Sequence, residues 1–161
     1  ESKEVKMECK PQNIAPIIQS IVAMHKNAAE AARQRLEVSA PTNLPNVNID
    51  RNQMEQVFIN LIDNAMKYTP QGGQIQININ LQLPFLCVEV IDSGIGIAGE
   101  HLPRIFERFY RVDKARSTET GGTGLGLAIV KHIVHAHNGK VEVHSVPKFG
   151  STFSVFFPFL Q

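Results

Sequence analysis

One stretch of the chain alternates between apolar and polar side chains, and it restricts the fold more than any other feature. From Gln74 to Leu83 every second residue is apolar, and the residues between them are Gln or Asn. A period of two predicts a β-strand with one buried face. Pro84 separates this stretch from a second predicted strand, Phe85–Ile91, and the two strands are expected to pair as an antiparallel hairpin.

Three helices are predicted around this hairpin. Apolar residues recur at helical spacing over Asn13–Leu36. Asp50 is a suitable N-cap with Gln53 as its capping-box partner, and the helix that it begins is expected to end near Tyr68. The third helix is expected over Gly124–His137.

The remaining strands complete an α+β pattern. A short strand is expected at Leu36–Ala40, followed by a loop without regular structure at Pro41–Asn48. A second hairpin is expected from Lys140–Val146 and Ser151–Phe157. Helices and hairpins segregated in this way predict a two-layer α/β sandwich, in which one sheet face carries the helices and the other faces solvent or a partner.

Length and charge narrow the possible functions. The chain has 161 residues, the size of one domain, and 16 Lys plus Arg balance 15 Asp plus Glu. A net charge of +1 provides no basic field for a phosphate backbone, so no nucleic-acid partner is expected. No apolar stretch reaches the ~20 residues that span a bilayer, and two cysteines make no disulfide framework, which favours a cytoplasmic location. We expect one domain over residues 1–161, with residues 1–12 as a linker or first strand.

The helix that begins after Asp50 has two different faces. Its polar face collects amides and charges, namely Gln56, Asn60, Asp63, Asn64 and Lys67. Asn is a poor helix former, so its recurrence one turn apart, at Asn60 and Asn64, indicates a functional role. Neutral oxygens at this spacing suit a Mg²⁺ ion that keeps several waters and is otherwise held by phosphates. The alternative is an ordinary solvated helix face.

A glycine-rich turn follows the second predicted strand. The segment after Asp92 contains the spacing G-x-G-x-x-G, at Gly94, Gly96 and Gly99. A dinucleotide-binding fold would require a long helix and a second parallel strand after it, and Pro103 and an Arg/Phe-rich stretch follow instead. We interpret Asp92 as the acceptor for the exocyclic amine of a base, with glycines that let the ring approach the backbone. A simple turn without a ligand is the alternative.

A second glycine-rich segment opens the last predicted helix. It is Gly121-Gly122-Thr123-Gly124-Leu125-Gly126, and the free backbone N–H groups at a helix N-terminus form an anion site. The preceding stretch, Arg108–Thr123, carries Arg111 and further basic residues, and we expect it to act as a lid over phosphates. Phe106 and Phe109 are expected to pack the base of this lid onto the core.

Five motifs in order give the chain a specific resemblance. NLIDNAMKYT, DSGIG, FERFYR, GGTGLGLAIVKH and GSTF resemble the sequence boxes of the catalytic ATP-binding domain of bacterial sensor histidine kinases, in the superfamily shared with gyrase, Hsp90 and MutL. The sequences of these motifs are most similar to those of phosphate-sensor kinases, and the resemblance covers nearly the whole chain. It implies the Bergerat sandwich, a mixed, mainly antiparallel sheet covered by about three helices.

The resemblance also implies roles for individual residues. The positions implied for catalysis are Asn60, Lys67, Arg108 and Arg111. Asn60 and Asn64 are implied at the Mg²⁺–phosphate face, and Lys67 and Tyr68 at the phosphate and nucleotide walls. Asp92 is implied at the adenine amine, Gly94 and Gly96 at the edge of the ring, and Arg108 and Arg111 at the phosphates. The lid-side backbone is implied at Gly122, Thr123, Gly124, Leu125 and Gly126, and Thr152 is implied beside Asp92 under the adenine.

The resemblance implies transfer of the γ-phosphoryl group of ATP, with Mg²⁺, to a histidine of a separate dimerisation domain, and a response regulator served indirectly. Position 60 is Asn where hydrolytic members of the superfamily have Glu, so the obvious base for activating water is missing. None of the six histidines lies in an acceptor motif, and the isolated domain is expected to be monomeric. It is expected to be the cytosolic part of a membrane-anchored sensor. The alternatives are a gyrase- or Hsp90-like ATPase and a nucleotide-sensing binding module without catalysis.

Overall fold

The alternating stretch forms an inner strand of a five-stranded sheet. In the computed structural model, which describes residues 6–112 and 125–159, β4 (Gln74–Gln82) pairs antiparallel with β5 (Phe85–Asp92), as predicted. The second predicted hairpin is also confirmed, as β6 (Lys140–Val146) and β7 (Gly150–Pro158). The strand order is β2-β4-β5-β7-β6, and β2 (Arg35–Ser39) pairs parallel with β4, so the sheet is mixed and mainly antiparallel.

A second, smaller sheet corrects the expected loop at Pro41–Asn48. The end of that stretch belongs to β3 (Val47–Ile49), which pairs antiparallel with β1 (Lys10–Gln12). An isolated bridge between Val47 and Phe159 connects this small sheet to the end of β7. The loop prediction was wrong here because the partner strand lies far away in the sequence, and local turn residues carry no information about it.

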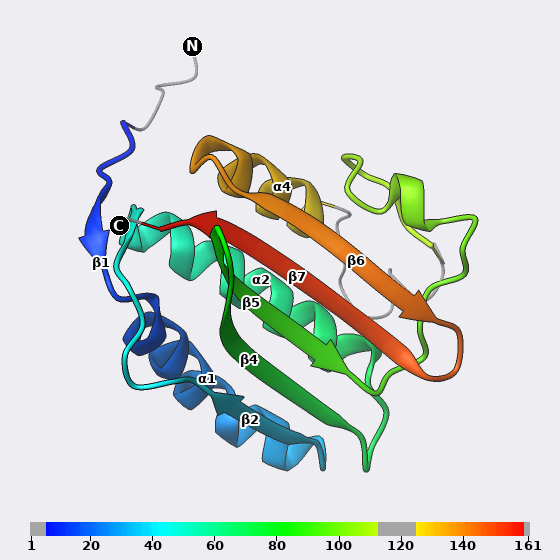
Figure 1. Ribbon diagram of the computed structural model, residues 1–161. Helices are drawn as coiled ribbons and strands as arrows, with labels where there is room; N and C mark the ends of the chain where they lie inside the picture. Colours follow the sequence, from blue (N-terminus) through cyan, green and yellow to red (C-terminus); the bar gives the residue numbers. More distant parts are fainter. Residues whose placement is uncertain (1–5, 113–124, 160–161) are drawn as a thin grey trace.

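In the described part of the chain, three α-helices lie on one face of the large sheet, as can be followed in Figure 1. They are α1 (Ile14–Ala31), α2 (Arg51–Tyr68) and α4 (Gly126–Ala136), and α2 contacts both of the others. A short 3-10 helix, η1 (Leu102–Arg104), lies between β5 and α4 in the chain. None of the described helices is long and apolar enough to cross a membrane. The predicted α+β two-layer sandwich is confirmed.

The first helix ends earlier than its apolar pattern predicts. Helix α1 stops at Ala31, and Arg33 adopts a left-handed backbone with φ of 54°. The Gln34 amide then donates to the carbonyl oxygens of Met66 at 2.8 Å and of Thr69 at 2.6 Å, at the end of α2. The residues from Arg35 onwards join the sheet, so tertiary pairing overrides the helical periodicity that extends to Leu36.

The core lies between the helices and the sheet. Ile75, Ile77 and Ile79 of β4 are at most 2% exposed, whereas Leu81, near the hairpin, is 45% exposed. The predicted apolar face of α2 is entirely buried; it consists of Met54, Val57, Phe58, Leu61, Ile62 and Ala65. The polar side chains of β4 lie on the opposite face of the sheet, where Asn80 donates to Glu89 of β5 at 3.0 Å.

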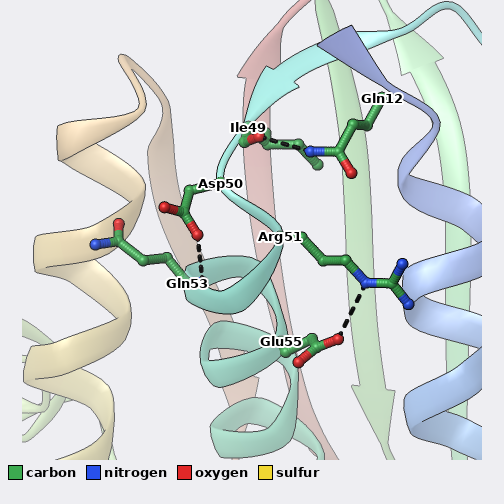
Figure 2. A network of polar contacts seen from close by, with 6 residues as sticks. All are labelled: Gln12, Ile49, Asp50, Arg51, Gln53 and Glu55. Atoms are coloured by element: carbon green, nitrogen blue, oxygen red, sulfur yellow. Dashed lines mark hydrogen bonds and ion pairs between the residues drawn. The ribbon is translucent and has the colours of Figure 1, made fainter. Parts of the chain in front are cut away.

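The beginning of α2 confirms one half of the predicted capping box and corrects the other. Oδ1 of Asp50 accepts from the backbone N–H of Gln53 at 3.1 Å (Figure 2). The Gln53 side chain does not return the bond, and its buried Oε1 has no hydrogen-bond partner among the described residues. The N–H of Asp50 donates instead to Nε2 of His137 at 3.1 Å, and Nδ1 of His137 contacts the Ile133 carbonyl at 2.8 Å. Because Nε2 accepts, the proton of this neutral ring is on Nδ1.

Asp50 also connects α2 to the preceding chain, since its Oδ2 accepts from the Glu8 N–H at 2.8 Å. The hydrogen bond from Glu8, followed by those from Gln53 and Asn52, lowers the pKa of the Asp50 carboxyl group. A group with a lowered pKa stabilises the fold above its ordinary value of about 3.9, and this contribution is lost as the pH falls through the folded-state value.

We therefore predict that Asp50→Ala lowers the free energy of unfolding by about 1–2 kcal/mol at pH 7. The difference from the parent chain shrinks below about pH 4, because the unfolded chain there binds a proton at Asp50 more readily than the folded chain does. Urea denaturation at pH 7 and pH 3 measures both values. Glu55→Ala is the control, because it removes only an exposed ion pair with Arg51 and changes stability by less than about 0.5 kcal/mol. A difference that is the same at both pH values would contradict the charge-based argument.

Candidate functional site

A pocket lies along the C-terminal half of α2. It is a cavity of about 280 Å³ whose lining comes from α2, the end of β5 with its following loop, residues 105–112, the start of α4 and Ser151. Asn60 and Tyr68 both line it, and eight residues at 1.5 Å rise separate them by about 12 Å along the helix axis. The pocket therefore extends over about two turns of α2.

The predicted polar face of α2 forms one wall of this pocket. Asn60, Asp63, Asn64 and Lys67 all line it, whereas Gln56 does not. The Asn60 amide nitrogen lies 3.4 Å from the Gly126 carbonyl oxygen as its donor. Because the nitrogen donates to Gly126, the amide oxygen is the atom of this group that could accept from or coordinate a ligand in the pocket. Burial of the opposite, apolar face of α2 is what directs these polar groups into the pocket.

Asp92 lies at the end of the pocket near the C-terminus of α2. It is 6% exposed, and its Oδ1 accepts from the N–H groups of Gly94 at 2.9 Å and of Ser151 at 3.2 Å. Burial raises the pKa of this carboxyl group, because the two hydrogen bonds only partly offset the loss of hydration. Both bonds use Oδ1, which leaves Oδ2 for a donor on a ligand.

The glycines after Asp92 allow backbones to approach closely. A Cβ on Gly94 would lie 2.5 Å from the Tyr68 carbonyl oxygen, and a Cβ on Gly96 would lie 2.2 Å from that of Val146. Gly96 also has φ of 72°, which favours glycine. Gly96 lines the pocket, and Gly94 does not. At Gly94 the structure therefore shows a packing requirement, where the sequence predicted contact with a ring.

The predicted basic residues separate into two groups. Arg111 lines the pocket, whereas Arg108 is exposed and lies outside the lining. Phe106 packs edge-on against Phe153 with ring centroids 6.2 Å apart, as predicted. The prediction for Phe109 was wrong, because this side chain is 70% exposed.

The second glycine-rich segment is only partly described. Gly126 lines the pocket at the first residue of α4, and Leu125 is the N-cap of that helix. The predicted positions Gly122, Thr123 and Gly124 and most of the lid at 108–123 lie outside the described residues.

The prediction for Thr152 requires a correction. Asp92 pairs with Ser151 in the β5–β7 ladder, and Ser151 rather than Thr152 lines the pocket. Neighbouring side chains on a strand point to opposite faces of the sheet, so Thr152 is on the face away from Asp92. The residue beside Asp92 is therefore Ser151, one position before the predicted Thr152.

Sequence reasoning missed several lining residues. Ile105, Tyr110 and Leu127 line the pocket. Tyr110 and Leu127 lie within the motifs FERFYR and GGTGLGLAIVKH, which were the available signal, whereas Ile105 resembles an ordinary core residue. Asp63 of the pocket wall also bonds His25 of α1, with 2.8 Å between Oδ1 and Nε2. The spacing of α2 indicated Asp63, but its partner on another helix could be found only from the fold.

The donor set in the pocket fits a phosphate-held Mg²⁺ ion better than a protein-built metal cage. Among the described residues, no cluster of three or more His, Cys, Asp or Glu side chains could hold a metal ion. The amide oxygens of Asn60 and Asn64, one turn apart on the wall, are hard neutral ligands of the kind that Mg²⁺ accepts alongside waters and phosphates. Lys67 and Arg111 provide positive charge on the same pocket.

Comparison with known proteins shows the family of the chain. Residues 49–161 match the family described as histidine kinase-, DNA gyrase B- and HSP90-like ATPases. The sensor-like histidine kinase SenX3 of Mycolicibacterium smegmatis is 42% identical over 146 residues, which cover 91% of this chain and 38% of that protein. The phosphate regulon sensor protein PhoR of Pseudomonas aeruginosa is 50% identical over 105 residues, which cover 65% of this chain and 24% of that protein. The chain thus spans well under half the length of these relatives.

Solved structures show the same fold. The nucleotide-free catalytic domain of the histidine kinase ThkA superposes with a TM-score of 0.83 at 27% identity, covering 95% of this chain and 97% of that one. Full-length ShkA in complex with AMPPNP superposes with a TM-score of 0.84 at 26% identity, covering 98% of this chain and 32% of that one. The chain belongs to the family of histidine kinase-, DNA gyrase B- and HSP90-like ATPases, and its fold is that of a sensor histidine kinase catalytic domain.

Proposed function

We propose that this chain binds ATP with Mg²⁺ in the α2 pocket and transfers the γ-phosphoryl group to a histidine of a separate dimerisation domain of its full-length protein. One observation carries the proposal: a single pocket brings together Asp92 at one end and the Asn60–Gly126 contact at the other. The buried carboxylate suits the exocyclic amine of adenine. The amides and cations suit a metal-bound triphosphate.

The chemistry needs positioning more than a catalytic base. When the acceptor imidazole nitrogen attacks the γ-phosphorus, an N–P bond forms, the bond to the ADP oxygen breaks, and ADP leaves. Lys67 and Arg111 would stabilise the negative charge on the phosphoryl oxygens. Asn60 accepts no proton from water, so the pocket favours transfer to a protein side chain over hydrolysis. Such a domain would act in the cytoplasm and serve a response regulator indirectly.

We predict that Asp92→Asn weakens the binding of ATP. Asn retains an oxygen for the N–H groups of Gly94 and Ser151 but presents its NH₂ group to the ligand, so ATP binding weakens by about 10- to 100-fold. A raised pKa means that the ionised carboxylate costs stability, and this cost grows as the pH rises through the folded-state value. The variant is therefore at least as stable as the parent at pH 7.

Calorimetry and thermal melting measure the two effects separately. GTP serves as the ligand control, because its carbonyl oxygen would face Asp92, and it should bind at least about 30-fold more weakly than ATP to the parent chain. An Asp92→Asn chain that binds ATP like the parent would remove Asp92 from the adenine site.

We predict that Asn64→Ala weakens the binding of ATP with Mg²⁺ but not that of adenosine. Because the proposed role of Asn64 is at the metal, the substitution weakens binding of ATP with Mg²⁺ by about tenfold and leaves adenosine binding within about twofold. Titrations with both ligands test this. Gln56→Ala is the matched control, since Gln56 belongs to the same polar face but lies outside the pocket. Equal losses for ATP and adenosine would refute a metal-specific role.

We also predict the outcome of a phosphoryl-transfer assay. Incubation with radiolabelled ATP and Mg²⁺ should leave the chain unlabelled but should label an added acceptor domain taken from its own full-length protein. The product should be acid-labile and base-stable, as expected for a phosphohistidine. Steady ATP turnover by the chain alone would favour the superfamily ATPase alternative, and ATP binding without any transfer would favour a nucleotide-sensing module.

A further inference from the structure

Four side chains spaced three residues apart line up beside the pocket: His101, Arg104, Glu107 and Tyr110. Their backbones are joined by successive bonds from each N–H to the carbonyl three residues earlier, at 2.9 Å for Arg104, 2.9 Å for Glu107 and 3.3 Å for Tyr110. Bonds of this type place every third side chain on the same side of the chain. Phe109, with φ of 66°, interrupts the run just before Tyr110.

Tyr110 is held at both its hydroxyl group and its ring. The hydroxyl oxygen is hydrogen-bonded to Nδ1 of His101, and the two rings have centroids 5.9 Å apart. The Arg104 guanidinium carbon lies 4.6 Å from the centroid of the Tyr110 ring. Arg104 is itself fixed by Glu107, whose Oε2 lies 3.2 Å from both Nε and Nη2. A cation over the ring and a hydrogen bond at its tip together restrict both side-chain torsions of tyrosine.

Only one member of this group reaches the ligand site. Tyr110 lines the pocket beside Arg111, whereas His101, Arg104 and Glu107 do not. Nε2 of His101 lies 3.5 Å from the Glu100 carboxylate, which can only accept, so the neutral ring carries its proton there and Nδ1 accepts from the Tyr110 hydroxyl. A protonated ring would donate from Nδ1 to the same oxygen. The bond can therefore form in either protonation state.

We propose that His101 is a positioning residue for nucleotide binding, which acts by fixing Tyr110 in the pocket wall before the nucleotide arrives. The proposal rests on the proposed function of the pocket. A wall residue that is already ordered loses less conformational freedom on binding, so the binding free energy is not reduced by ordering the ring. The identity of the atom that contacts Tyr110 should then matter more than the volume of the side chain.

The test compares His101→Leu, His101→Asn, Tyr110→Phe and the double variant His101→Leu/Tyr110→Phe, with Mg²⁺ and AMPPNP as the probe in calorimetry. His101→Leu and Tyr110→Phe should each weaken binding about fivefold, the loss expected for one hydrogen bond. The double variant should be no weaker than either single variant, because both remove the same bond. His101→Asn, whose amide lies near the former Nδ1 position, should stay within about twofold of the parent.

Spectroscopy provides a readout that does not depend on the nucleotide. The chain has two tyrosines and no tryptophan, and both tyrosines line the pocket. An NMR spectrum selective for ¹³C-labelled tyrosine rings thus contains two sets of signals, which Tyr68→Phe assigns. His101→Leu should shift the Tyr110 signals in the nucleotide-free chain and leave those of Tyr68 unchanged. His135→Leu, at an exposed position on α4, is the matched control and should change neither the spectrum nor the affinity.

The outcomes separate this inference from the proposed function. A parent chain that binds no AMPPNP refutes the proposed function, and the positioning role falls with it. If the parent binds but His101→Leu binds equally well, the positioning role alone is overturned. It is also overturned if the losses of the two single variants multiply in the double variant, or if His101→Asn is as weak as His101→Leu.

Discussion

The burial of one face of α2 is the constraint on which the rest of this structure depends. A helix is a rigid cylinder, so fixing its apolar side against the sheet also fixes the direction of every side chain on the other side. Six apolar residues of α2 are at most 2% exposed, and the amides and charges opposite them form a wall of the pocket. The α2 wall of the site is therefore positioned by core packing.

The N-terminus of α2 shows how this helix is held along its axis. Asp50 bonds the preceding chain through Glu8 and the first turn of α2 through Gln53, and its backbone N–H bonds His137 after the end of α4. The apolar face alone would let α2 slide along its axis over the sheet. Such a displacement would break the hydrogen bonds of Asp50. The same junction thus fixes the distance between Asn60 of α2 and Gly126 of α4, which meet in the pocket.

Asp92 illustrates how a binding site lowers the stability of its own fold. A buried carboxylate whose pKa is raised is a group that the folded chain holds in an unfavourable form at neutral pH. An amide in its place would satisfy the same two backbone N–H groups without the charge. A ligand with a hydrogen-bond donor at this position would offset that cost, which is the role proposed above for the exocyclic amine of adenine.

The sequence by itself determined the periodic elements and the polar face that α2 turns to the pocket. The alternation from Gln74, the two faces of α2 and the Asp50 cap all depend on local spacing, and each was confirmed. The tertiary structure decided the partners: β3 for β1, His137 for the Asp50 N–H, and His101 for Tyr110. It also decided that Ser151 rather than Thr152 faces Asp92. Local spacing depends on neighbouring residues, whereas register and contacts across the fold depend on how all elements pack together, so they became visible only in three dimensions.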